Sequence, residues 1–226
     1  AETAGAASFM RTDGRIVDTR AFYDRISGAY DLIADASEAA CREHGLEALG
    51  VEPGERVLEI GFGTGHALEK LSDAVGPAGL VCGLDISKGM AKMALAQVRA
   101  RRNVHVVLGD GRLPCCRDAV FDAAFMSFTL ELFEVSTIPV VLAGVHRMLK
   151  PAGRLSVVAM ADTDHTNSMI EIYQWLHRHF PHFVDCRPIN LVAVLERAGF
   201  GVTARHLMSI WGLPVMMAVG VRRGGQ

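Results

Sequence analysis

Arg56-Val-Leu-Glu-Ile-Gly-Phe-Gly-Thr-Gly65 is followed after a short interval by Leu80-Val-Cys-Gly-Leu-Asp85. The first stretch begins with an apolar run suited to a strand that is buried on both faces, and its glycines let the chain turn tightly beside a ligand. The second stretch is another apolar run, and it ends in a carboxylate. A ligand of an open parallel sheet lies across the carboxyl ends of the strands, so Asp85 can accept hydrogen bonds from both ribose hydroxyls. The pattern therefore predicts a nucleoside-binding half-site.

Two residues distinguish this half-site from a dinucleotide-binding turn. The dinucleotide fingerprint G-x-G-x-x-G ends in glycine, whereas this chain has His66, which would crowd the helix against the strand and a pyrophosphate. Glu59 precedes the first glycine by two positions. Its negative charge would repel a pyrophosphate and attract an ammonium or sulfonium group. A nucleotide-dependent oxidoreductase is therefore the weaker alternative.

The segment Glu59-Ile-Gly-Phe-Gly-Thr-Gly65 resembles the first motif of the class I S-adenosylmethionine-dependent methyltransferases, which reads acid-x-G-x-G-x-G. The resemblance runs from about Phe22 to Val221. Val104-His-Val-Val-Leu-Gly-Asp-Gly-Arg-Leu-Pro114 is similar to the third strand and its loop, and Phe121-Asp-Ala-Ala-Phe-Met-Ser-Phe128 is similar to the fourth strand. The family's L-K-P-G-G turn is also present, with Ala152 in place of its first glycine.

The resemblance implies a fold as well. It predicts an α/β, doubly wound, Rossmann-like sheet of seven strands in the order 3-2-1-4-5-7-6, mostly parallel. Alternating strands and helices up to about Val158 favour the parallel part with right-handed crossovers. Phe200–Ile210 and Pro214–Val221 are expected to form a closing antiparallel hairpin, preceded by a helix over Asn190–Ala198.

We expect one methyltransferase domain over residues 1–226. Within it, 1–50 would form an N-terminal arm and helical cap, and 51–226 the core. An insertion at about 160–188 would form the wall of the acceptor site. The arm, up to about residue 18, is expected to close over bound cofactor.

The cofactor that the resemblance implies is S-adenosyl-L-methionine. The three glycines would form the turn under its methionine moiety, Glu59 would face the ammonium group, Asp85 the ribose and Asp110 the adenine amino group. Two apolar residues after the second and third strands would flank the adenine ring or simply pack in the core. Thr64 is expected to cap the following helix. The complete predicted set is Tyr30, Glu59, Gly61, Gly63, Gly65, Asp85, Ile86, Met90, Asp110, Gly111, Leu113 and Ser127.

The branch of the family is indicated by Phe22-Tyr-Asp-Arg-Ile-Ser-Gly-Ala-Tyr-Asp31. This segment resembles an element that precedes the core in the ubiquinone/menaquinone and small-molecule methyltransferases, where the second tyrosine covers the carboxylate end of the cofactor. Apolar residues near the expected acceptor mouth also fit a lipophilic acceptor. These are Phe128, Leu130, Leu132, Phe133, Phe180 and Phe183. The methyl acceptor could therefore be a quinol-like compound, a lipid, a phenol or an amine.

Composition narrows the classes of partner. With 226 residues and 50% hydrophobic content, the chain can build one α/β domain with a sizeable core. A formal net charge of -2 does not favour a nucleic-acid partner. There is no run of about eighteen apolar residues, so no transmembrane segment is predicted, although peripheral membrane contact stays open. Five cysteines without a secretory segment favour the cytoplasm. The oligomeric state is left open.

No metal site is predicted. The adjacent Cys115 and Cys116 could form a redox pair or a soft-metal site, but we interpret them as loop packing, because neighbouring cysteines rarely chelate one ion alone. Nothing in the sequence brings Cys41, Cys82 or Cys186 to this pair.

The histidine-rich segment is not interpreted as a metal site either. His177, His179 and His182 are not spaced to share one helical face. One of them, or His165, is a candidate base for an acceptor, because imidazole titrates near neutrality. No other catalytic residue is predicted. Methyl transfer by in-line displacement depends mainly on alignment and exclusion of water, although a non-catalytic S-adenosylmethionine-binding module stays open.

Overall fold

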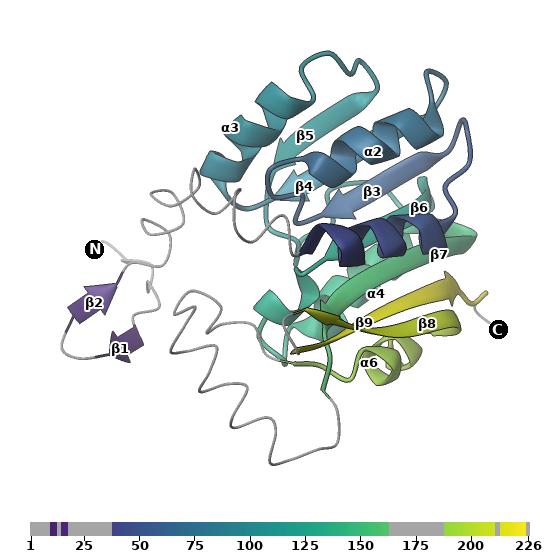
Figure 1. Ribbon diagram of the computed structural model, residues 1–226. Helices are drawn as coiled ribbons and strands as arrows, with labels where there is room; N and C mark the ends of the chain where they lie inside the picture. The colour runs from purple at the N-terminus through teal and green to yellow at the C-terminus, as the bar shows by residue number, and fades with distance from the viewer. Residues whose placement is uncertain (1–9, 13–14, 18–37, 163–187, 211–212, 225–226) are drawn as a thin grey trace, which may run out of the picture.

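A seven-stranded sheet forms the centre of the computed structural model, which describes residues 10–12, 15–17, 38–162, 188–210 and 213–224. The strand order is β5-β4-β3-β6-β7-β9-β8 (Figure 1). Numbered from the first strand of this sheet, the order is 3-2-1-4-5-7-6, which confirms the prediction. The strands are β3 (Arg56–Ile60), β4 (Leu80–Asp85), β5 (Val104–Leu108), β6 (Phe121–Ser127), β7 (Leu149–Met160), β8 (Phe200–Ile210) and β9 (Leu213–Arg222).

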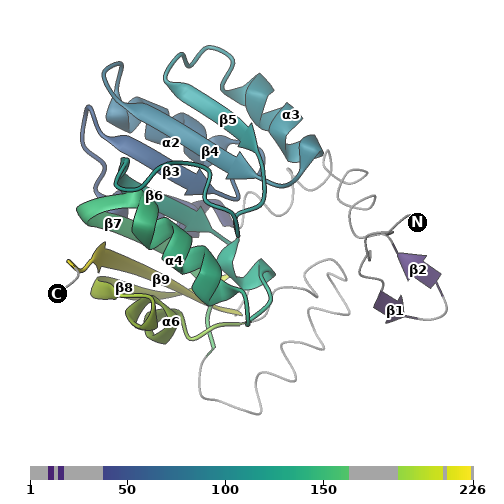
Figure 2. The same cartoon turned by 180° about the vertical axis from the view of Figure 1, so that it is seen from behind.

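Helices cover both faces of this sheet. The helical residues 38–49, α2 (His66–Val75) and α3 (Lys88–Gln97) lie on one face (Figure 1). The helices α4 (Ile138–Met148) and α6 (Leu191–Arg197) lie on the other (Figure 2). The chain is therefore doubly wound, as expected.

Three short elements complete the described fold. A single 3-10 turn, η1 (Leu130–Leu132), follows β6. Near the N-terminus, β1 (Met10–Thr12) and β2 (Arg15–Val17) pair antiparallel as a separate hairpin.

The central strand β3 is buried from Val57 to Ile60 because helices cover it on both sides. Val57, Leu58, Glu59 and Ile60 are each at most 2% exposed. A strand buried on both faces needs a continuous apolar run rather than an alternating pattern. The parallel neighbours β4 and β6 pair with it in register, so the carboxyl ends of these strands meet at one edge.

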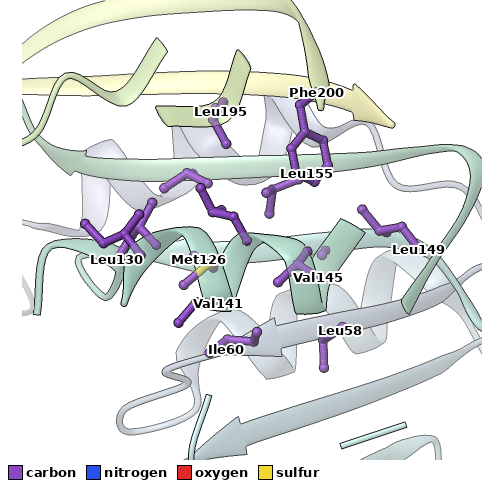
Figure 3. Packing of buried hydrophobic residues seen from close by; sticks show 14 of the residues in the cluster. Leu58, Ile60, Met126, Leu130, Val141, Val145, Leu149, Leu155, Leu195 and Phe200 are labelled. Atoms are coloured by element: carbon purple, nitrogen blue, oxygen red, sulfur yellow. The ribbon is translucent and has the colours of Figure 1, made fainter. Parts of the chain in front are cut away.

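Two apolar clusters hold the layers together. The first joins α2 and the helical residues 38–49 to one face of the sheet. The second joins α4 and α6 to the opposite face (Figure 3). In Figure 3, Leu58 and Ile60 of β3 and Met126 of β6 lie across from Val141 and Val145 of α4. Packing on both faces fixes the strand ends that carry the site.

The C-terminal hairpin also follows the prediction. Strand β9 pairs antiparallel with both β7 and β8. The Asn190 side chain caps α6 by accepting the Ala193 N–H at 3.1 Å, and the chain leaves the helix at Gly199 with φ of 88°. Among the described helices, none is long and apolar enough to cross a membrane.

Candidate functional site

Asp85 organises the edge of the sheet where β3 and β4 end. Its Oδ2 accepts the Gly63 N–H at 3.1 Å, and its Oδ1 accepts the Ser87 N–H at 2.8 Å. The first bond ties the glycine turn to β4, and the second holds the start of α3. Partial burial raises the pKa of Asp85, and the backbone N–H groups of Ser87, Gly63 and Ile86 oppose that rise. Each carboxylate oxygen has a second lone pair for a further donor.

The glycine turn places open space beside this carboxylate. Gly61 has φ of 74°, and a Cβ there would lie 2.2 Å from Thr129 Oγ1, so no larger residue fits. Gly63 has φ of 51°, but a Cβ on it would have no described neighbour within 4 Å. Gly61 is thus required by packing, whereas Gly63 leaves room for another molecule to approach the backbone.

The helix after the turn begins differently from the prediction. The N-cap of α2 is Gly65, and no side chain caps it. The expected capping role of Thr64 is therefore wrong. A helix N-terminus without a side-chain cap favours a negatively charged or polar group nearby.

Glu59 is a buried acid at the same edge. It is 2% exposed, and its Oε2 has no hydrogen-bond partner within the described residues. Burial raises its pKa to about 8, although the nearby Arg42 charge lowers it and the Asp85 charge raises it further. A buried carboxyl with an unused oxygen is costly unless a donor reaches it.

The structure exposes Ile86 and Leu113, the two residues expected to flank an adenine ring or to pack in the core. Each is 67% exposed. The alternative that both simply pack in the core is therefore wrong. Large apolar side chains exposed beside a polar site are suited to contact a ligand ring.

Asp110 lies in the same region and carries a local ion pair. Its Oδ1 accepts the Arg112 backbone N–H at 2.9 Å, and its Oδ2 accepts Arg112 Nε–H at 2.8 Å. The Arg112 guanidinium lowers the pKa of Asp110. The neighbouring Gly111 packs closely, since a Cβ there would lie 3.0 Å from side-chain atoms of Ile60 and Phe133. Asp110 is thus ionised and held in place, but already paired.

Ser127 and Met90, two other predicted residues, lie at the end of β6 and in the first turn of α3. Ser127 ends β6, and its buried Oγ has no partner among the described residues. Met90, in the first turn of α3, packs against the first apolar cluster, and its N–H reaches Ser87 Oγ at 3.3 Å. Tyr30, His165, His177, His179 and His182 lie outside the described residues, as do Phe180 and Phe183.

Sequence reasoning missed Glu131. This residue lies in η1 and is 1% exposed. Its Oε1 accepts the Met160 N–H at 3.1 Å, while Oε2 has no partner in the described part of the chain. Burial raises its pKa to about 7, opposed by backbone N–H groups. The sequence signal was an acid inside the apolar run Phe128-Thr-Leu-Glu-Leu-Phe133.

Sequence analysis also did not predict the contact that Cys82 makes. Cys82 lies beside Cys115 and Cys116, and the three Sγ atoms are within 4.8 Å of one another. A hydrogen bond from Cys82 lowers the pKa of Cys115 to about 6, and the pKa of Cys82 is raised in turn. The sequence contains no signal for this contact. It forms only because the loop between β5 and β6 folds back over the sheet and brings residues 115 and 116 to β4.

Known proteins support the resemblance. Residues 57–153 match a family described as a methyltransferase domain. The chain is 32% identical over 137 residues to nocamycin O-methyltransferase from Saccharothrix syringae, covering 60% of this chain and 48% of that protein. It is 35% identical over 144 residues to demethylmenaquinone methyltransferase from Tropheryma whipplei, covering 62% of this chain and 58% of that protein. The chain thus spans about half the length of these curated relatives.

A solved structure gives the same fold. A SAM-dependent methyltransferase from Aquifex aeolicus superimposes with a TM-score of 0.66 at 21% identity, over 88% of this chain and 98% of that one. The family match and the curated relatives confirm that the chain resembles the class I S-adenosylmethionine-dependent methyltransferases.

Proposed function

We propose that this protein transfers a methyl group from S-adenosylmethionine to a small or lipophilic acceptor. The observation that carries the proposal is the buried Glu59 carboxyl with an unused oxygen, held beside an open glycine turn and Asp85. A methyltransferase domain match over residues 57–153 covers this whole group.

The residues present fit this cofactor. An ammonium group would supply the missing donor to Glu59 Oε2 and offset the cost of burying that acid. The second lone pairs of Asp85 can accept ribose hydroxyls while the oxygens keep the Gly63 and Ser87 bonds. Exposed Ile86 offers an apolar contact for a purine ring. A pyrophosphate would instead meet the negative charge of Asp85 and would bring no proton donor to Glu59 Oε2.

When bound, S-adenosylmethionine supplies an electrophilic methyl group on a sulfonium. The protein's part is to hold the acceptor in line and to exclude water. Glu131 lies at the neighbouring end of β6 and β7, where its unused Oε2 can accept a proton from the acceptor. Its raised pKa of about 7 suits that role near neutral pH.

An apolar acceptor is supported by the residues after β6. Phe128 has φ of 49°, a strained backbone conformation for a bulky residue. Such strain is often retained at functional sites. Leu132, four residues on, is 50% exposed. A relative that acts on demethylmenaquinone and one that methylates an oxygen of nocamycin support the same acceptor class.

Binding is tested by calorimetric titration with S-adenosylmethionine, S-adenosylhomocysteine and NAD. We expect saturable binding of the first two and little affinity for NAD. Asp85→Ala should weaken cofactor binding by at least about tenfold, since each charge-assisted bond contributes roughly 1.5 to 3 kcal/mol. Asp110→Ala should do less, because Arg112 already engages that carboxylate. Saturable binding of NAD alone would refute the proposal.

Turnover is tested with methyl-labelled cofactor and a panel of quinols, lipids, phenols and amines. Transfer of label to any of them establishes the activity and its acceptor class. Tight cofactor binding without transfer to any class would favour a non-catalytic binding module instead.

A further inference from the structure

Three free thiols converge on the α4 side of the sheet, away from the glycine turn. Cys82 lies inside β4 and is 6% exposed, whereas Cys115 and Cys116 are half-buried in the loop between β5 and β6. All three Sγ atoms lie within 4.8 Å of one another. A lone buried cysteine commonly serves as a small apolar residue. Here a strand cysteine meets two loop cysteines, and the three sulfur atoms together could bind one metal ion.

The path of the loop explains this meeting. Strands β4 and β3 separate β5 from β6 in the sheet, so residues 109–120 must cross both of them. Figure 2 shows this crossing on the α4 side. Successive side chains of an extended segment point to opposite sides, but the chain bends at Cys116. The bend directs both loop thiols toward Cys82.

Helix α4 supports the loop at this point. A Cβ on Gly144 of α4 would lie 3.9 Å from Cγ of Pro114, so helix and loop are in contact. The second apolar cluster packs against Cys115 and Cys116 and includes Cys82. The thiols are thus held on a rigid strand and a supported loop, while the partial exposure of the loop pair leaves a path for a small ion.

We propose that Cys82, Cys115 and Cys116 bind a soft metal ion, with Cu(I) as the preferred species. With metal–sulfur bonds of about 2.3 Å, three thiolates around one ion lie about 4.0 Å apart. Sulfur atoms within 4.8 Å therefore need to move by less than about 1 Å. Thiolates select soft ions such as Cu(I). Within the described residues no His, Asp or Glu side chain joins the three thiols, so the group lacks the fourth protein ligand that structural zinc sites use.

The binding step conserves charge and oxidation state. Each thiol that still carries a proton releases it to solvent, three sulfur–copper bonds form, and copper stays monovalent. The product ties the loop 109–120 to β4. This site is independent of the proposed methyl transfer.

The test uses the full chain, reduced, desalted and kept under anaerobic conditions. Cu(I) is titrated in competition with bicinchoninate, and the loss of the coloured chelate reports transfer to the protein. Cys82→Ala and Cys116→Ser should each lower Cu(I) affinity by at least about a hundredfold. Cys41→Ala is the matched control, because Cys41 is equally buried but lies in the other apolar cluster. It should leave the affinity unchanged.

A second measurement places the ion. Hydrogen exchange within residues 109–120 should slow when Cu(I) is added to the parent protein but not to Cys116→Ser. Because Cys116 is in a partly exposed loop, this variant should fold normally. Unchanged Cu(I) affinity in both cluster variants, or an equimolar amount of Zn(II) that prevents the parent protein from withdrawing Cu(I) from bicinchoninate, would overturn the proposal.

Discussion

At the scale of single residues, Glu59 couples the site to pH. Its pKa in the folded protein is about 8, above the usual value of 4.5. Between these values the folded state keeps a proton that the unfolded chain has lost. This contribution to stability is complete below the unfolded pKa and disappears as pH rises through about 8.

Glu59→Gln should therefore flatten the fall in stability between pH 5 and pH 8. One pKa unit corresponds to about 1.4 kcal/mol, so the difference should exceed about 1 kcal/mol. Urea unfolding at both pH values measures it. Glu69→Gln is the control, because this acid lies on the partly exposed side of α2 and has a pKa lowered by its hydrogen bond with Arg101. An unchanged pH slope in Glu59→Gln would contradict the assigned burial.

The second buried acid should control the pH dependence of turnover. Glu131 has a pKa of about 7, so methyl transfer should rise as pH passes through that value and the carboxylate forms. Glu131→Gln should remove this rise and lower turnover by about a hundredfold or more. The glutamine oxygen can still accept the Met160 N–H, so the fold should survive.

Cofactor affinity separates a catalytic from a structural role for Glu131. It should be the same in Glu131→Gln as in the parent protein, as measured by calorimetry. An unaltered pH profile of turnover would show that Glu131 only caps the end of β7.

At the scale of elements, the turn between β3 and α2 contains one glycine required for packing, Gly61, and one expected to contact the cofactor, Gly63. Gly61→Ala would force a Cβ against Thr129 and should destabilise the fold by more than about 2 kcal/mol. Gly63→Ala should fold but bind S-adenosylmethionine at least about tenfold more weakly, because its Cβ enters the open space. Gly54→Ala is the control. Gly54 also has a positive φ, and a Cβ there would have no neighbour within 4 Å, so this variant should not affect binding. Denaturant unfolding and calorimetry test all three.

In the turn at the start of β7, an alanine occupies a position where glycine would be favoured. Ala152 has φ of 62°, a left-handed conformation that costs an L-residue roughly 1–2 kcal/mol. Ala152→Gly should therefore stabilise the protein by up to about 1 kcal/mol, after the entropy cost of glycine. Ala96→Gly, at an exposed position of α3, should instead destabilise it by about as much. A loss of stability in Ala152→Gly would contradict the assigned turn.

Elements with local signals could be predicted from the sequence. The apolar runs of β3 and β4, the glycine turn and the stop at Gly199 each depend on neighbouring residues, and each lies where it was expected. The contacts of Glu131 and Cys82 depend instead on distant strands and a folded loop, which no periodicity reports. Thr64 is not the cap because α2 begins one residue later than a Thr64 cap requires, with Gly65 as its N-cap.

At the scale of the whole molecule, helices pack on both faces of the sheet and hold in place the edge where the parallel strands have their carboxyl ends. Glu59, Asp85, Ser127 and Glu131 all lie at this edge, although they come from separate strands and loops. Such rigidity suits a reaction whose barrier falls mainly through alignment. In the proposed mechanism the buried Glu131 carboxyl would take the acceptor's proton, so that step would not need a histidine.

We therefore expect single substitutions of His165, His177, His179 and His182 by alanine to lower turnover by less than about a hundredfold each, the lower limit for a positioned base. His105→Ala, at an exposed position of β5, provides the reference for a surface histidine. Turnover with labelled cofactor and the identified acceptor measures the effect, alongside cofactor affinity. A loss of several thousandfold in one variant that still folds and binds cofactor would identify that histidine as the base, because misalignment of a residue without a chemical role would disturb binding as well.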